Sequence, residues 1–150
     1  MSSRRPSQLH LVRGLAERRE QQLAGEVGEL MRQRAGADAT SSRLCGYLDE
    51  YAAAPAGGAR HARTPGEIDN ERRFVGRLAD AIEQQRARAE RLARRAGEKM
   101  ELWQRARANL EALDRVLAQR ERGQQRDLER REQRDSDALT ARRAATEAMS

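Results

Sequence analysis

The strongest constraint on the fold is an apolar repeat that runs from Ile68 to Leu117. Steps of alternately three and four residues along it reach apolar side chains at all but three positions. The positions are Ile68, Glu71, Val75, Leu78, Ile82, Gln85, Ala89, Leu92, Ala96, Lys99, Trp103, Ala106, Leu110, Leu113 and Leu117. Such spacing puts a narrow apolar seam along one side of a helix, as in a coiled coil. The segment is therefore expected to be a long helix that packs against a partner helix.

The composition agrees with a fold that has a seam and no wide core. Charged residues make up 36% of the chain, aromatic residues 3% and hydrophobic residues 37%. This mixture cannot fill a broad interior, but it suits long helices whose only dry surface is a stripe. High charge also marks disordered chains, and the regular seam argues against disorder here.

A second seam occupies the first half of the chain and predicts a helix over residues 7–53, with Pro6 suited to its first turn. This seam slips by one step near Glu20, which resembles a stutter that would locally unwind a supercoil. Its positions are Leu9, Val12, Ala16, and then Leu23, Val27, Leu30, Arg34, Ala37, Ser41, Leu44, Leu48 and Tyr51.

Residues 54–64 contain a proline and two adjacent glycines without any period, and they predict a loop. Thr64 and Glu67 flank Pro65 in the pattern of a capping box, which predicts that the second helix starts at Pro65 and continues to about residue 147. Two seams joined by so short a loop should pack antiparallel, with the fold-back centred near Ala59.

The expected fold is therefore all-α: one domain, a long antiparallel two-helix coiled-coil hairpin whose second helix is longer and protrudes. Beyond Leu117 the seam positions become polar, although Asp127 and Arg131 are spaced to support continued helix by pairing. This overhang is either a solvated, fraying tail or a segment that another molecule surrounds with a polar socket.

Catalysis and cofactor binding find no support in the sequence. His10 and His61 are far apart, Cys45 is the single cysteine, and no metal-spaced cluster or phosphate-binding glycine loop occurs. Net charge is +6, but acids interrupt every basic run, which argues against nucleic-acid binding. No apolar run matches a membrane span, and the N-terminus lacks a signal-peptide core. We expect a cytoplasmic protein that is no enzyme and needs no cofactor or metal.

Apolar residues exceed the needs of the seam near the predicted loop. Tyr47 joins Tyr51 at helical spacing, and Phe74 with Ala81 widens the seam at Leu78. Exposed aromatic side chains of this kind anchor protein partners. The alternative is that they wrap the end of the hairpin and prevent fraying.

Four features of the chain resemble the FliJ family of flagellar export proteins. The first predicted helix ends in L-x-x-Y-x-x-E-Y at residues 44–51, and NERRFVGRLADAI follows a glycine-rich gap at residues 70–82. Trp103 precedes the leucine-rich end of the seam, and a charged helix continues to Asp137. The resemblance covers nearly the whole chain, and its most specific part is the tyrosine pair followed by N-x-x-x-F-x-x-x-L-x-x-A-I.

The resemblance implies a stalk-like coiled coil of the flagellar type III export apparatus, needed for flagellum biogenesis and hence for motility and chemotaxis. The implied partners are the export ATPase FliI, the export gate protein FlhA and export chaperones, with peripheral association at the inner face of the cell membrane through the apparatus. The implied gate-binding residues are Leu44, Tyr47, Tyr51, Phe74, Leu78, Ala81 and Gln85. The implied ATPase-ring contacts are Arg120, Arg126, Arg130, Arg131 and Arg134. Alternatives are the equivalent stalk of a virulence-type secretion system and a generic coiled-coil scaffold.

Overall fold

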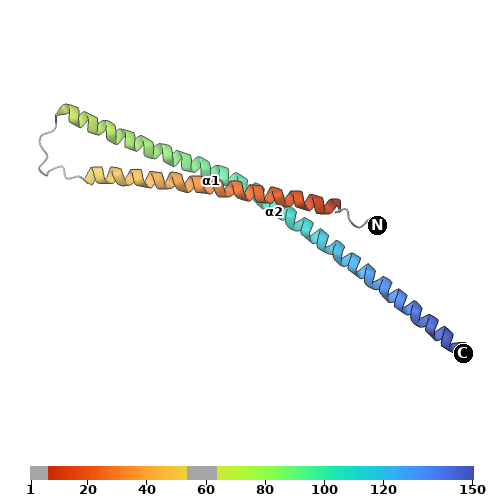
Figure 1. Ribbon diagram of the computed structural model, residues 1–150. Coiled ribbons are helices and arrows are strands. Elements are labelled where there is room, and N and C mark those ends of the chain that lie inside the picture. The colour runs from red at the N-terminus through yellow and green to blue at the C-terminus, as the bar shows by residue number, and fades with distance from the viewer. Residues whose placement is uncertain (1–6, 54–63) are drawn as a thin grey trace. The chain divides into compact units, whose positions relative to one another are not determined.

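Two long helices make up almost all of the computed structural model, which describes residues 7–53 and 64–150 (Figure 1). Helix α1 is Gln8–Ala53 and helix α2 is Pro65–Ala148. No strand occurs among the described residues, and α2 is much the longer helix. The all-α fold and the longer second helix are thus confirmed. Pro6 and residues 54–63 of the expected loop lie outside the described residues.

Ser7 caps the start of α1. The N–H groups of His10 and Leu11 donate to the Ser7 carbonyl oxygen at 2.9 and 3.2 Å, and the N–H of His10 also donates to the Ser7 hydroxyl at 3.3 Å. A serine hydroxyl in this position satisfies an amide that the first helical turn leaves without a partner. The helix therefore begins one residue after Ser7.

The capping box at the start of α2 is confirmed. The N–H of Glu67 donates to the Thr64 hydroxyl, and the N–H of Thr64 donates to the Glu67 carboxylate, each at 3.2 Å. Pro65 follows the cap in the first helical position, where its missing N–H costs nothing. These bonds fix the first residue of the helix.

Replacement of the cap, Thr64→Ala, should lower the free energy of unfolding by about 1 kcal/mol, because one amide of the first turn loses its partner. Urea unfolding followed by circular dichroism measures this change. Thr146→Ala is the matched control, since the Thr146 hydroxyl only donates to the Arg142 carbonyl oxygen in the last turns of the same helix. Equal losses in both variants would contradict the capping role.

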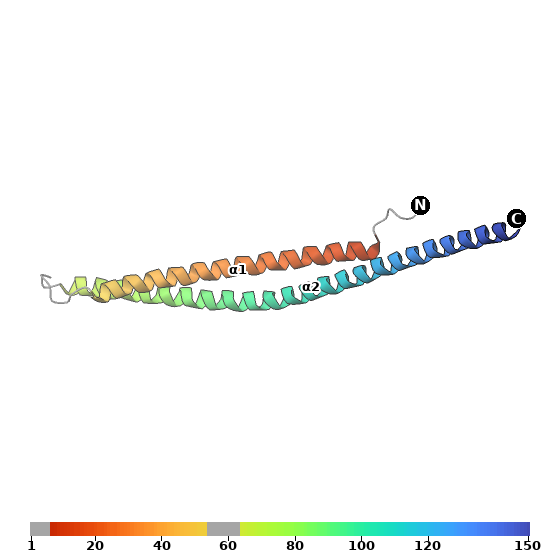
Figure 2. The same ribbon diagram turned by 90° about the horizontal axis from the view of Figure 1, so that it is seen from below.

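The helix pair divides into two compact units, one made of Met1–Glu20 with Arg105–Ser150 and the other of Gln21–Gln104. In the second unit, Glu26 pairs with Lys99 at 2.9 Å and Tyr51 contacts Phe74 with ring centroids 5.3 Å apart. The later residue of α1 thus meets the earlier residue of α2, so the two helices of this unit are antiparallel (Figures 1 and 2).

The register of this unit differs from the expected one. The midpoint of each pair, Glu26 with Lys99 and Tyr51 with Phe74, lies between residues 62 and 63, whereas the sequence suggested a centre near Ala59. In this register, the first two turns of α2 extend past the end of α1 (Figure 1). In the middle of the seam, Ala37, Ala89 and Leu92 form a buried cluster, and Leu30 packs against it.

The seam of α1 contains two charged residues that the sequence interpretation placed elsewhere. Arg13 and Glu20 are partly buried on either side of Ala16, and Val12 is 48% exposed. The 3,4 spacing therefore continues without interruption to Leu23. The predicted slip near Glu20 is wrong because it assumed that Val12, rather than Arg13, occupies the seam.

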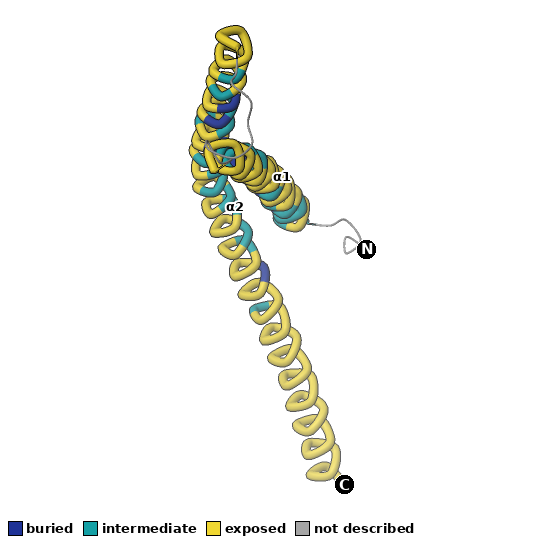
Figure 3. The backbone as a smooth tube through the Cα atoms, turned by 90° about the vertical axis from the view of Figure 1, so that its left-hand side faces the viewer, coloured by how far each residue is buried: buried dark blue, intermediate teal, exposed yellow. Residues whose placement is uncertain are grey.

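Packing along α2 ends at Leu117, which is its last buried residue. From residue 118 to residue 150 every position except Gly123 is exposed, and Figure 3 shows this end of α2 in yellow. Asp127 and Arg131 do not form the expected ion pair. In the described part of the chain no helix packs against this segment, which we call the overhang, residues 118–148.

Candidate docking surfaces

An exposed aromatic cluster lies near the end of α1. The rings of Tyr51 and Phe74 are tilted by 49° and join the two helices, yet Tyr51 is 39% exposed and Phe74 48%. Tyr47, one turn earlier on α1, is 57% exposed. Aromatic side chains that keep so much accessible area can add contact energy on binding without much loss of side-chain freedom. We call Tyr47, Tyr51 and Phe74 the aromatic cluster.

A shallow depression adjoins the aromatic cluster. It is lined by Tyr51 and Phe74 together with Glu67, Asn70 and Glu71 from the first turns of α2. The carboxylate of Glu67 also accepts the Thr64 N–H, so the cap holds part of the depression in place. Carboxylates beside exposed rings suit a partner surface with apolar and basic groups.

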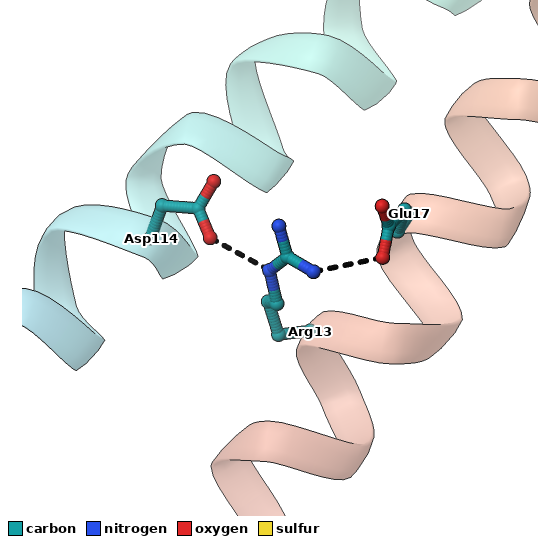
Figure 4. A network of polar contacts seen from close by, with 3 residues as sticks. All are labelled: Arg13, Glu17 and Asp114. Carbon is teal, nitrogen blue, oxygen red and sulfur yellow. Dashed lines mark hydrogen bonds and ion pairs between the residues drawn. The ribbon is translucent and has the colours of Figure 1, made fainter.

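Within the unit that contains residues 1–20 and 105–150, a polar contact joins the start of α1 to α2. The Arg13 guanidinium donates to Asp114 and to Glu17, each at 2.7 Å (Figure 4). The hydrogen bond to Asp114, and then the charge of that carboxylate, raise the pKa of Arg13. Arg13 stays cationic at any physiological pH and orients the two helices at this level.

The overhang presents charged side chains of both signs. Residues 118–150 contain eight arginines and seven acids, so the surface is strongly polar but nearly neutral. The five arginines expected to contact an ATPase ring are all exposed, and none of them forms an ion pair with another described residue. They are Arg120, Arg126, Arg130, Arg131 and Arg134.

The sequence model of the family described as Flagellar FliJ protein matches residues 5–148. The chain belongs to the FliJ family. It is therefore a component of flagellar type III protein export, and the match favours the flagellar over the virulence-type assignment. Searches of curated proteins and of solved structures found no match.

Of the residues that the FliJ resemblance implied for gate binding, Tyr51 and Phe74 contact each other across the two helices. Tyr47, Tyr51 and Phe74 are exposed, whereas Leu44, Ala81 and Gln85 are partly buried and Leu78 is buried in the seam. A direct contact would thus involve the aromatic cluster first. The role of all seven residues stays a prediction.

Sequence reasoning missed the carboxylate and amide groups beside this FliJ aromatic cluster. The depression is lined by Glu67, Asn70 and Glu71 because the first two turns of α2 extend past the end of α1. Ile68 is exposed for the same reason. The capping box marked the start of α2, but its level relative to α1 depends on the register.

Other chemistry is sparse in this FliJ-family chain. Within residues 7–53 and 64–150, no cluster of three or more histidine, cysteine or acidic side chains could hold a metal ion. Cys45 accepts a long contact from Arg86 at 3.5 Å. None of the described helices combines the length and the low polarity that crossing a bilayer requires. His61 lies outside the described residues.

Proposed function

We propose that this protein is a stalk that binds the export ATPase FliI with the overhang and the export gate protein FlhA with the aromatic cluster. The observation that carries the proposal is the length of α2 beyond Leu117 in a chain of the FliJ family, since no described residue of another helix packs against this length. An isolated helix of about thirty residues with few apolar contacts is marginal in water. Enclosure by a ring of subunits would stabilise it.

The polarity of the overhang favours a polar socket. Guanidinium groups such as those of Arg126 and Arg130 can form bidentate bonds to carboxylates on the inner wall of a ring, while the interleaved acids meet basic groups. A mixed surface also permits sliding and rotation, because no single large apolar patch fixes one orientation. Stabilisation of the ATPase hexamer by the inserted helix would raise the ATPase rate.

The aromatic cluster is proposed to contact the gate protein. Tyr47, Tyr51 and Phe74 supply the apolar anchors, and the nearby carboxylates supply polar bonds at the rim. Nucleotide turnover in the ring would then be coupled mechanically to gate opening through the helix pair. The protein acts without catalysis, cofactor or nucleic acid, on the cytoplasmic side and peripheral to the membrane. Export chaperones are further proposed partners, with no site assigned.

The double variant Tyr47→Ala with Phe74→Ala should weaken binding of the gate protein's cytoplasmic part by at least about tenfold, since two exposed aromatic anchors are lost. Isothermal titration calorimetry measures the dissociation constant, and circular dichroism measures helix content. Helix content should stay unchanged, because both side chains lie largely outside the seam.

Met31→Ala with Leu102→Ala is the matched control, since both residues are exposed and apolar and lie away from the aromatic cluster. This control should bind like the unaltered chain. If the Tyr47 and Phe74 variant lost helix content but each folded molecule bound the gate protein with unaltered affinity, the cluster would serve to stabilise the end of the helix pair and not to bind a partner.

A further inference from the structure

A row without any acid continues from the aromatic cluster along α2. Alternating steps of three and four residues from Phe74 reach arginine at four of the seven positions and an acid at none. The positions are Phe74, Arg77, Ala81, Gln84, Arg88, Arg91 and Arg95. The next step reaches Glu98, and the row ends there. Residues at this spacing share one face of a helix.

The four arginines of this basic row are accessible and lack partners within the described chain. Arg77, Arg88, Arg91 and Arg95 are exposed, and none forms a hydrogen bond or an ion pair there. By contrast, Arg73, next to Phe74 on α2, pairs with Asp69 at 3.4 Å. The basic row therefore keeps its charge available to another molecule.

The facing helix does not neutralise the basic row. At the level of Arg88 to Arg95, the acids of α1 are occupied on their own helix: Glu29 binds Arg32 at 2.9 Å and Asp38 lies 3.8 Å from Arg34. The hydrogen bond from Arg32 lowers the pKa of the Glu29 carboxyl, followed by one from Gln33. Arg43 of α1 adds a further cation, and its partner among the described residues is the Thr40 hydroxyl at 3.3 Å.

We infer that the basic row binds an acidic segment of the same protein partner that contacts the aromatic cluster. This inference rests on the proposed function, because it extends the gate-binding surface from Phe74 to Arg95. The row is about 30 Å long at 1.5 Å per residue and one side chain wide. An extended acidic segment matches that shape.

Charge balance favours such a segment over a membrane or a nucleic acid. Asp80, Glu83 and Glu90 lie on the same stretch of α2 outside the basic row, so a broad anionic surface would meet them as well. A narrow peptide avoids these carboxylates. Four exposed ion pairs would add little affinity each but would steer association and set the register.

The test compares the full chain with the variant Arg88→Gln, Arg91→Gln, Arg95→Gln. The matched control is Arg72→Gln, Arg142→Gln, Arg143→Gln, which changes net charge equally at exposed residues outside the basic row. Affinity for the gate protein's cytoplasmic part is measured at several salt concentrations, and a synthetic peptide of alternating Asp and Glu is a second probe. The basic-row variant should bind both probes about tenfold more weakly than the control, with a shallower salt dependence.

The outcomes separate the two proposals. Unaltered gate binding and salt dependence in the basic-row variant would overturn the inference and leave the proposed function standing. If the gate protein fails to bind the unaltered chain, the proposed function fails. The inference is then tested with the peptide alone: equal affinity of the basic-row variant and the control for the peptide would overturn it. Vesicles with phosphatidylglycerol are a third probe. The inference would also be overturned if the basic-row variant lost binding to the vesicles but kept its affinity for the gate protein and for the peptide.

Discussion

A chain that ends at Leu117 is expected to keep its helix pair and to lose association with the export ATPase. Leu117 is the last buried residue of α2, so the deletion removes no packed side chain. The deletion does remove the whole overhang, which is proposed to enter the ring. Co-purification and ATPase rate against added protein measure the effect, and stimulation by the full chain should fall to the unstimulated rate.

Two controls accompany the truncation after Leu117. Circular dichroism should show that the shorter chain unfolds at nearly the temperature of the full chain, because both retain the same seam. A full-length variant with glutamine at the five arginines that are proposed to contact the ring is the second control. It keeps the helix, so it separates the guanidinium groups from the shape of the overhang. ATPase association by the chain that ends at Leu117 would contradict ring insertion.

Truncation of the most buried side chain, Leu23→Ala, should lower the free energy of unfolding by about 2–5 kcal/mol. Leu23 is 1% exposed and is the largest fully buried side chain of the described residues. Few other large side chains are buried in this narrow seam, so little surrounding structure can move in to fill the cavity. A loss of this size is a large part of the 5–15 kcal/mol that typically stabilises a domain. Urea unfolding followed by circular dichroism measures it.

Leu128→Ala is the control for this loss, because Leu128 belongs to the overhang and is 53% exposed. The same chemical change there should alter the free energy of unfolding by less than about 0.5 kcal/mol. Comparable losses at Leu23 and Leu128 would show that the seam does not carry the stability of the helix pair.

The candidate docking surfaces were only partly accessible to sequence reasoning. Tyr47 and Phe74 were predicted correctly as exposed aromatic residues near the turn, because helical spacing alone places them off the seam. Leu78 was grouped with them but is buried, because it occupies a position of the 3,4 seam itself. The place of Glu67 beside Tyr51 depends on both helices and has no signature in either one.

The sequence by itself determined the two helices, the cap at Thr64 and the end of the packed seam at Leu117. These are local properties: a 3,4 period, a reciprocal hydrogen-bond pattern and a change from apolar to polar side chains are each contained in one segment. The tertiary structure decided the register and the place of Arg13 on the seam. Two antiparallel seams of this kind can slide with little change in apolar burial. Contacts between the helices, such as those of Glu26 with Lys99 and of Arg13 with Asp114, select one alignment.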